Sequence, residues 1–276
     1  MICNGITLAK ETEQQLAAAF AAYAKKPTLG LVVTKSTPEI ELFVRKKQEM
    51  GTRIGVEVVC VRLQNELVSE DGVVALLHET AEKYDGVVLQ LPFPQGVDAE
   101  RVLSLLPEVC DVDVLGAPAY SSFVAGSSTV VPPVVGAMRR VLASAQYSLA
   151  GKRVCVVGHG RLVGAPAAVW ARREGADVVV VTEKTADIAA ETRRADVLIL
   201  GAGVPGSITP EMVHESVVVL DAGTSEAAGR LRGDADPAVA EKALLFTPTP
   251  GGIGPLTVVE IFANLHALTA AVSRAE

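Results

Sequence analysis

The stretch 152–175, KRVCVVGHGRLVGAPAAVWARREG, indicates the fold of the chain more clearly than any other segment. It begins with β-branched residues that favour a buried strand, and it ends with a helical pattern. Between these two parts lie Gly158, Gly160 and Gly164. In a strand–loop–helix unit, glycines allow a tight turn, a close approach of the backbone to a pyrophosphate, and close packing of helix on strand. The pattern therefore predicts a dinucleotide-binding loop, and a purely structural turn is the alternative.

Strand-like and helix-like segments alternate on both sides of this stretch, which is typical of α/β architecture with mostly parallel sheets. The pattern breaks near residue 136, so we expect two α/β domains around a cleft, of which the C-terminal one is a Rossmann-type dinucleotide-binding domain. The predicted boundaries are 1–136 plus 255–276 for one domain and 137–254 for the other. The predicted strands are 28–34, 55–63, 85–91, 152–158, 176–182, 195–201 and 216–223; the predicted helices are 8–26, 38–54, 69–84, 99–106, 134–146, 164–175, 186–194 and 256–275; and 111–132 is expected to be irregular.

Composition and charge exclude several classes of protein. The 276 residues include 25 Lys and Arg against 32 Asp and Glu, and the net charge of −7 argues against nucleic acid or an anionic membrane as the main partner. The mean hydropathy of +0.35 is high, but the apolar runs are far shorter than the ~18 residues that span a bilayer. We therefore expect a globular protein with an aliphatic core.

The cysteines and the N-terminus indicate the compartment. Cys3, Cys60, Cys110 and Cys155 are widely spaced and have no nearby histidines. This spacing predicts neither a zinc site nor a disulfide framework, so we expect no metal and a reducing environment. The N-terminus has no basic region followed by an apolar stretch, so we expect no signal peptide and a cytoplasmic protein.

An acidic residue, Glu183, follows the next predicted strand, 25 residues after Gly158. A carboxylate at that place accepts hydrogen bonds from a ribose 2′-OH and repels a 2′-phosphate, which favours NAD. Lys184 and Arg161 are nearby cations that could instead pair with the 2′-phosphate of NADP. The sequence favours NAD without excluding NADP. Alternatively, Glu183 is simply a solvated residue of a turn.

A lysine interrupts an apolar stripe in the predicted helix 38–54. The stripe consists of Ile40, Phe43, Lys47, Met50 and Ile54 at helical spacing. Either the ammonium of Lys47 reaches along the edge of the core into water, or it points into a cleft, where loss of solvent lowers its pKa and suits it to proton transfer. The pattern alone favours the first arrangement.

Polar side chains lie near the end of the predicted strand 85–91 and beyond it. Gln90 is at the strand end where ligands bind in α/β sheets, although it could simply satisfy the backbone of the following loop. Asp111 and Asp113 could place one carboxylate in the cleft, although such aspartates more often close turns. The stretch 247–257, TPTPGGIGPLT, predicts a stiff loop that lets backbone approach a ligand, or a rigid hinge.

Together these motifs resemble the bifunctional methylenetetrahydrofolate dehydrogenase/cyclohydrolase family over nearly the whole chain. The resemblance rests on FVRKKQEMG (43–51), DGVVLQLPFP (85–94), CDVD (110–113), GKRVCVVGHGRLVGAP (151–166), KTAD (184–187) and PTPGGIGPLT (248–257). It implies hydride transfer from 5,10-methylenetetrahydrofolate to NAD or NADP, followed by hydrolysis of the methenyl product to 10-formyltetrahydrofolate. It also implies a homodimer, with the folate bound in the cleft between the domains.

The same resemblance implies roles for individual residues. Lys47 would transfer a proton in the hydrolytic step, Gln90 would hydrogen-bond the lysine and the substrate, and Asp113 would hold the pterin ring. The implied substrate-binding residues are Phe43, Leu91, Pro92, Gly254 and Pro255. The implied cofactor-binding residues are Gly158, His159, Gly160, Arg161, Val163, Gly164, Glu183 and Lys184.

The chain departs from the family pattern at several of these positions. Phe43 stands where the family usually has tyrosine, and Val114 stands where it has glycine. His159, Gly160 and Glu183 replace residues that suit a 2′-phosphate, in agreement with the lean to NAD. Two other hypotheses stay open: a catalytically impaired paralogue that acts as a nucleotide- or folate-binding regulatory protein, and a dehydrogenase for another small molecule.

Overall fold

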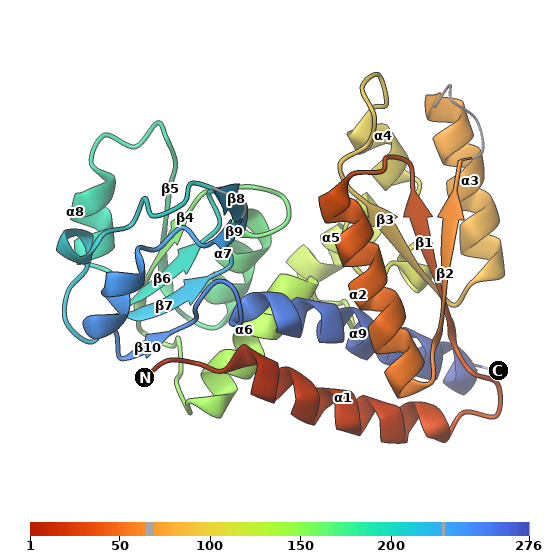
Figure 1. The fold of residues 1–276 in the computed structure, drawn as a ribbon, viewed down its shortest axis with the longest axis horizontal. Coiled ribbons are helices and arrows are strands. Elements are labelled where there is room, and N and C mark those ends of the chain that lie inside the picture. Colours follow the sequence, from red (N-terminus) through yellow and green to blue (C-terminus); the bar gives the residue numbers. More distant parts are fainter. Residues whose placement is uncertain (64–68, 228–229, 276) are drawn as a thin grey trace. The chain divides into compact units, whose positions relative to one another are not determined.

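The computed structural model describes residues 1–63, 69–227 and 230–275, and it confirms the α/β fold with two compact units (Figure 1). The three-stranded unit comprises Glu11–Pro133 and Val258–Glu276, and the five-stranded unit comprises Met1–Lys10 and Val134–Thr257. The first residues group with the five-stranded unit because the N–H of Cys3 donates a hydrogen bond to the carbonyl of Phe246 at 2.8 Å. The domain boundaries predicted from the sequence, 1–136 plus 255–276 and 137–254, stay a prediction.

Three parallel strands form the sheet of the three-stranded unit. They are β1 (Thr28–Val33), β2 (Glu57–Arg62) and β3 (Gly86–Gln90), in the order β2-β1-β3. Two helices pack on them, α2 (Pro38–Ile54) and α3 (Glu70–Lys83) (Figure 1). The register pairs Val33 with Gln90, so β1 and β3 end at the same edge of the sheet. The segments that follow these strands gather at this edge, where ligands bind in parallel sheets.

Helix α2 has the predicted bounds because both of its ends carry capping residues. The side chain of Thr37 accepts a hydrogen bond from the N–H of Ile40 at 3.3 Å, and Pro38 occupies the first turn. Gly55 ends the helix with φ 80°, a left-handed conformation that glycine adopts without strain. The buried face of the helix includes Ile40, Met50 and Ile54.

Four further elements connect these strands and helices or precede them. Helix α1 (Gly5–Ala21) begins in the five-stranded unit and continues in the three-stranded unit. Helix α4 (Ala99–Ser104) begins at the predicted residue, with Asp98 as its cap, and the 3-10 helix η1 (Glu108–Cys110) follows it. The fourth is α5 (Ala117–Ala125).

Helix α5 shows that the prediction of an irregular stretch over 111–132 is wrong. The helix has nine residues, with Pro118 in its first turn and Gly126 as its C-cap at φ 82°. Its buried residues are Ala119 and Phe123, which lie four positions apart. One such pair is too short a pattern to reveal helical periodicity in the sequence.

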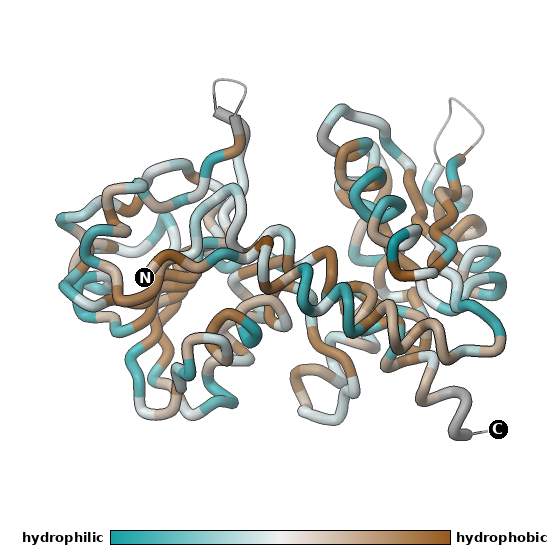
Figure 2. The backbone as a smooth tube through the Cα atoms, turned by 60° about the horizontal axis from the view of Figure 1, so that its bottom comes forward, coloured by the Kyte–Doolittle hydropathy of each residue, from teal (hydrophilic) through white to brown (hydrophobic). Residues whose placement is uncertain are grey.

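The five-stranded unit has a parallel sheet in the order β10-β7-β6-β4-β5. Every residue of β6 and β7 is buried, as expected for central strands covered on both faces, and Figure 2 shows strands of this sheet in brown. The elements are α6 (Pro133–Ser144), β4 (Arg153–Val157), α7 (Gly164–Arg173), β5 (Asp177–Val181), α8 (Ile188–Arg193), β6 (Val197–Leu200), η2 (Pro210–Met212), β7 (Val218–Asp221), β8 (Ser225–Ala227), β9 (Arg230–Arg232), η3 (Pro237–Glu241) and β10 (Leu245–Phe246).

The last helix, α9 (Ile253–Ala275), is the most apolar long element of the described chain. By length and composition alone, Ile253–Ala271 could cross a membrane, which the short apolar runs of the sequence did not suggest. Yet Leu256, Val259, Phe262 and Leu265 are fully buried. The apolar face of α9 therefore belongs to the core of the protein itself.

Candidate active site

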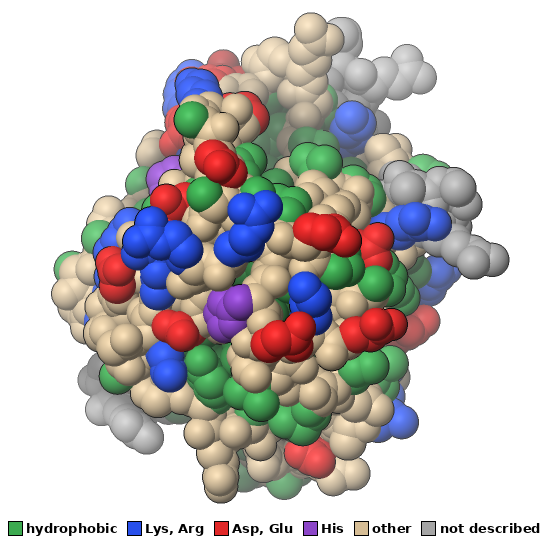
Figure 3. Space-filling view, turned by 90° about the vertical axis from the view of Figure 1, so that its left-hand side faces the viewer, with side chains coloured by type: hydrophobic (Ala, Val, Ile, Leu, Met, Phe, Trp, Pro, Cys, Tyr) green, Lys and Arg blue, Asp and Glu red, His purple; other side chains and the backbone are tan. Residues whose placement is uncertain are grey.

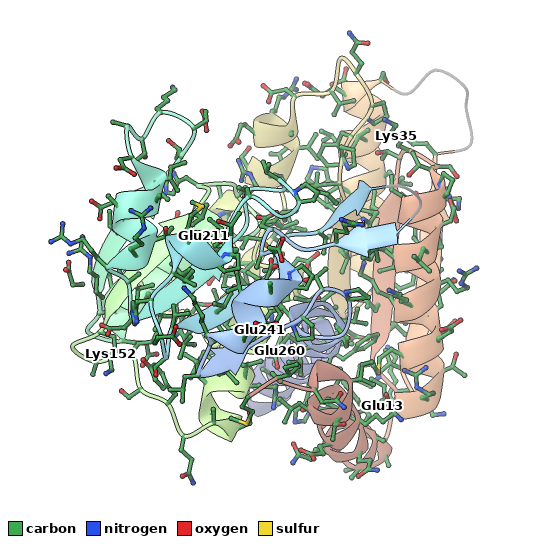
Figure 4. The ribbon with its side chains drawn as sticks, turned by 60° about the vertical axis from the view of Figure 1, so that its left-hand side comes forward. Glu13, Lys35, Lys152, Glu211, Glu241 and Glu260 are labelled. Atoms are coloured by element: carbon green, nitrogen blue, oxygen red, sulfur yellow. The ribbon has the colours of Figure 1, made fainter. Side chains whose placement is uncertain are left out.

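Lys47 lies at the centre of the candidate site. Only 7% of this residue is exposed, and its Nζ donates a hydrogen bond to Oε1 of Gln90 at 3.1 Å. A second hydrogen bond, from Nε2 of Gln90 to the carbonyl of Leu91 at 3.3 Å, orients the amide. The prediction that the ammonium reaches water is wrong, because the end of β3 offers it a buried polar partner. Lys35, which follows β1 at the same sheet edge and is labelled in Figure 4, is exposed.

Burial and charge have opposite effects on the pKa of Lys47. Burial removes water from the ammonium and lowers its pKa, and the negative charge of Asp113 partly restores it. For Asp113, burial raises the pKa of the carboxyl, and the charge of Lys47 lowers it. A lysine with a lowered pKa gives up its proton at lower pH than an exposed lysine does, which suits Lys47 to proton transfer.

Phe43 presents an aromatic ring beside this amine. The ring centroid is 5.9 Å from Nζ of Lys47 and 5.7 Å from Nζ of Lys46. Phe43 is 38% exposed, unlike the buried residues of the same stripe. Just beyond β3, Leu91 is half-buried and Pro92 is exposed. An exposed ring next to a buried amine forms a surface on which a flat aromatic group of a ligand can stack.

A tight turn carries Asp113. Its N–H donates a hydrogen bond to Oδ1 of Asp111 at 3.2 Å, and the N–H of Gly116 donates to Oδ2 of the same carboxyl at 2.7 Å. Between them, Val114 has φ 54°, in the left-handed region that a β-branched residue rarely adopts. The backbone at position 114 therefore has the conformation that favours glycine.

Asp111 supports this turn from inside the unit. The residue is fully buried, and burial raises the pKa of its carboxyl to about 7, against the effect of the backbone N–H groups that lower it. Asn264 of α9 adds a second support, because its Nδ2 donates to the carbonyl of Val112 at 2.8 Å. Asn264 was not predicted as a site residue, although a buried asparagine in an apolar helix is a signal that sequence can show.

The three glycines of the 152–175 stretch form a turn between β4 and α7. Gly158 has φ 92°, and a Cβ there would lie 2.7 Å from the carbonyl oxygen of Gly201. A Cβ on Gly164 would overlap the carbonyl oxygen of Gly158, so the first turn of α7 packs directly on this loop. A Cβ on Gly160 would meet nothing within 4 Å. The loop is closed on the protein side and open at Gly160, as a pyrophosphate cradle requires.

The other loop residues differ in exposure. His159 and Arg161 are exposed, whereas Val163 is half-buried and its side chain lies against Gly201. Val163 therefore packs against the protein side of the loop and does not line its open side. Gly201 was not among the predicted residues; its position directly after the apolar run VLIL was the available signal.

Glu183 and Lys184 lie at the exposed tip of the turn after β5. The turn is closed by a hydrogen bond from the N–H of Thr182 to Oγ1 of Thr185 at 3.0 Å. The N–H of Gly158 donates to the carbonyl of Val181 at 2.8 Å, so the glycine loop and this turn start from adjacent strand ends.

Two buried aspartates next to the glycine loop were not predicted. Oδ2 of Asp234 accepts hydrogen bonds from the N–H groups of Ala202, at 2.7 Å, and Gly203, at 3.0 Å. Asp221, at the end of β7, accepts in turn from the N–H of Asp234 at 3.2 Å, and burial raises its pKa to about 6. Together they hold the segment after β6. The carboxylate inside the apolar motif VVVLDAG was the signal for Asp221.

The remaining predicted residues lie at the start of α9. Gly254 is exposed, with open space where a Cβ would be, and Pro255 is half-buried. Both belong to the five-stranded unit, whereas Lys47, Gln90 and Asp113 belong to the three-stranded unit. Their part in a folate pocket stays a prediction.

Charged side chains of both signs are mixed on the face drawn in Figure 3. Lys and Arg alternate there with Asp and Glu, and apolar groups lie between them. Among the described residues of that face we see no continuous basic surface of the kind that nucleic acid binding requires. That nucleic acid and membranes are not partners stays a prediction.

Two family models match nearly the whole chain. The catalytic-domain model of tetrahydrofolate dehydrogenase/cyclohydrolase matches residues 3–113, and the NAD(P)-binding-domain model of the same family matches residues 132–273. Together they confirm the predicted family and the order of its two parts.

Curated relatives and solved structures agree with these matches. The bifunctional protein FolD of Exiguobacterium sp. is 34% identical over 258 residues, which cover 92% of each chain. That of Thermus thermophilus is 33% identical over 267 residues, covering 95% of this chain and 94% of the relative. The FolD of Trypanosoma brucei, solved with NADP and an inhibitor, superposes with a TM-score of 0.93 at 27% identity, over 99% of this chain and 98% of that one.

Proposed function

The chain belongs to the tetrahydrofolate dehydrogenase/cyclohydrolase family, and we propose that Lys47, Gln90 and Asp113 are its catalytic residues. The observation that carries the proposal is the buried hydrogen bond of 3.1 Å between Nζ of Lys47 and Oε1 of Gln90. A lysine placed only for solubility has no reason to be buried against an amide at a strand end.

The enzyme oxidises 5,10-methylenetetrahydrofolate to 5,10-methenyltetrahydrofolate and hydrolyses the product to 10-formyltetrahydrofolate. Bound NAD or NADP supplies the hydride acceptor for the first step. In this proposal the carboxylate of Asp113 accepts hydrogen bonds from the N–H groups of the pterin ring. The exposed ring of Phe43 stacks on the aminobenzoyl ring, and Leu91 and Pro92 also contact the folate. Contacts from Gly254 and Pro255 stay a prediction of the family resemblance.

In the hydrolytic step, Lys47 accepts a proton from water as the water oxygen attacks the methenyl carbon. The bond from that carbon to N5 then breaks, the carbonyl of the formyl group forms, and N5 takes the hydroxyl proton. Lys47 must be uncharged to accept the first proton, and burial, which lowers its pKa, favours that form. The hydrogen bond to Gln90 holds the amine in place.

The five-stranded unit has the features that a nicotinamide dinucleotide needs. The glycine loop offers backbone without side chains at Gly160, and the N-terminus of α7 follows it. Gly158, His159, Gly160 and Arg161 would contact the phosphates, and Gly164 and Val163 would hold the loop in shape. Bound there, the dinucleotide would meet exposed groups of both signs in Glu183 and Lys184.

We infer that the cofactor is NAD rather than NADP. Glu183 is exposed at the tip of the turn after β5, adjacent to the glycine loop. Its carboxylate can accept hydrogen bonds from ribose hydroxyls and repels a 2′-phosphate.

Exchanging this carboxylate for a hydroxyl, in Glu183→Ser, is expected to shift the ratio of kcat/KM for NAD to that for NADP by about tenfold toward NADP. The physical reason is the loss of repulsion between two negative charges. Glu241→Ser, on another exposed glutamate of the same unit, labelled in Figure 4, is the control and should leave the ratio unchanged. An unchanged ratio in Glu183→Ser would mean that the carboxylate does not face the ribose.

A paired assay tests the proposed function. Reduction of NAD or NADP is followed with and without methylenetetrahydrofolate, and the absorbance of the methenyl compound is followed in the same sample. We expect reduction only when the folate is present, followed by decay of the methenyl absorbance. Folate binding without turnover would support a regulatory paralogue, and cofactor reduction by another substrate but not by this folate would support a different dehydrogenase.

We also propose that the protein is a homodimer. Strand β5 is an edge of the five-stranded sheet, and its residues 178–180, three valines, are only half-buried. An apolar edge strand is usually covered, and a second copy of the chain can cover it. Sedimentation equilibrium should therefore give about twice the chain mass of 28.8 kDa. A single species with the mass of one chain would contradict the dimer.

We propose the cytoplasm as the location. Each of the four cysteines lies in the described part of the chain and is free, and Cys3, Cys110 and Cys155 are buried. Free thiols are typical of a reducing compartment.

A further inference from the structure

We propose that Asp111 is a positioning residue for the reaction: its carboxylate holds Val114 in a left-handed backbone conformation and thereby fixes the place of Asp113. This inference rests on the proposed function, because binding of the folate by Asp113 is part of that proposal. Asp111 itself is fully buried and touches no ligand in this account.

The turn from Asp111 to Gly116 is tied to the strand that ends in Gln90. The backbone of Asp111 forms a parallel bridge with Val87 of β3, three residues before Gln90. The carbonyl of Val112 accepts a hydrogen bond of 2.8 Å from Nδ2 of the buried Asn264. The start of the turn is thus fixed relative to the hydrogen-bonded pair of Lys47 and Gln90.

The middle of the turn has an unfavourable backbone conformation. Val114 has φ 54° and is 1% exposed, so a β-branched side chain is held inside the protein with left-handed backbone. Such a residue keeps this conformation only when its surroundings impose it. A turn with glycine at this position would need no such constraint.

The carboxylate of Asp111 supplies the constraint. Its two oxygens accept hydrogen bonds from the N–H of Asp113, at 3.2 Å, and from the N–H of Gly116, at 2.7 Å, one on each side of Val114. Gly116 lies close against this carboxylate, since a Cβ on it would lie 3.0 Å from Oδ2 of Asp111. If one of these bonds is lost, Val114 can relax, and the side chain of Asp113 moves with the backbone.

The variant Asp111→Asn tests the role because it keeps the shape of the side chain while it removes one acceptor and the negative charge. An amide has nearly the same shape, but it has one acceptor oxygen, and its NH₂ group faces the other backbone N–H. We expect the KM for methylenetetrahydrofolate to rise about tenfold, while the KM for NAD or NADP changes less than about twofold. Asp85→Asn is the control for the same exchange of carboxyl for amide at the opposite end of the sheet, because one oxygen, Oδ2, accepts both hydrogen bonds from Thr28 and an amide oxygen can keep them.

Val114→Gly then separates positioning from general stability. With glycine, the left-handed conformation has little cost, so Asp111→Asn should raise the folate KM only about twofold in this background. An equal rise in both backgrounds would contradict the proposal, as would an unchanged folate KM in Asp111→Asn. A rise of the same size in Asp85→Asn would show a general loss of stability and would also overturn it.

If Asp111→Asn does not fold, hydrogen exchange of the native protein still tests whether the carboxylate of Asp111 holds the N–H groups of Asp113 and Gly116. The amides of Asp113 and Gly116 should be protected about as well as those of β3, because both are bonded to a buried carboxyl. Exchange at the rate of an unstructured peptide would contradict the proposal. Absence of turnover in the native protein would contradict the proposed function, whereas turnover with unchanged KM in Asp111→Asn would contradict this inference alone.

Discussion

The variant Lys47→Met will hydrolyse methenyltetrahydrofolate about 10²–10⁴ times more slowly than the native protein, and it will still fold. Methionine has a similar length and no charge, and it completes the apolar stripe whose other buried members are Ile40, Met50 and Ile54. The change leaves Oε1 of Gln90 without its donor and the buried carboxyl of Asp113 without its counter-charge, which destabilises the fold, while the apolar packing of methionine offsets part of that loss. We therefore expect a lower thermal midpoint with a cooperative unfolding transition, measured beside the decay of the methenyl absorbance.

The control for this variant is Arg45→Met, which removes an exposed cation from the same helix. It should leave hydrolysis within about twofold of the native rate, since an exposed pair with Glu49 contributes little. Hydrolysis at the native rate in Lys47→Met would show that this amine takes no part in the reaction. Loss of hydrolysis together with loss of the folded state would shift the test to Lys47→Arg, which keeps the charge but should also lose the hydrolytic rate, because a guanidinium stays protonated.

Gly164→Ala will abolish measurable reduction of NAD and NADP. A Cβ at this position would overlap the carbonyl oxygen and carbon of Gly158, which are backbone atoms and cannot rotate away. Either α7 moves off the loop or the loop changes its shape, and the cost in the free energy of unfolding is about 1–3 kcal/mol or more. Hydrolysis of methenyltetrahydrofolate needs no dinucleotide, and the catalytic residues that we propose for it, Lys47, Gln90 and Asp113, lie in the three-stranded unit, so this activity should persist.

Gly160→Ala separates binding from packing in the same loop. Its Cβ would meet nothing within 4 Å, so we expect the native thermal midpoint. The methyl group nevertheless occupies space that the pyrophosphate needs, and the KM for the dinucleotide should rise about tenfold or more. Native cofactor kinetics in both glycine variants would contradict the proposed cradle.

Elements with strong local signals could be predicted from the sequence. Helix α2 matches its predicted range because Thr37, Pro38 and Gly55 mark its ends and an apolar stripe marks its buried face. Helix α5 could not be predicted, since only Ala119 and Phe123 are buried in it. Strand β10 (Leu245–Phe246) is likewise too short for a periodic pattern, and it is a strand only because it pairs with β7.

The identity of the site residues could be predicted more readily than their geometry. Helical spacing places Lys47 on an apolar face, but its partner, Gln90, comes from a strand 43 residues later, so burial of the amine depends on tertiary structure. The same limit applies to Val114, whose φ of 54° is imposed by hydrogen bonds on both sides of it. Residues that act on backbone groups of distant segments, such as Asp234, carry no local pattern at all.

The pH dependence of methenyltetrahydrofolate hydrolysis shows whether Lys47 is the base, because it reports the protonation of the amine during the reaction. Lys47 must lose its proton to act as a base, and burial lowers its pKa below the ordinary lysine value of about 10.4. The enzymatic rate, after subtraction of the rate without enzyme, should therefore rise with pH along a limb whose midpoint lies below that value. This limb should be missing in Lys47→Met. A rate that does not depend on pH, or the same limb in both proteins, would contradict the account.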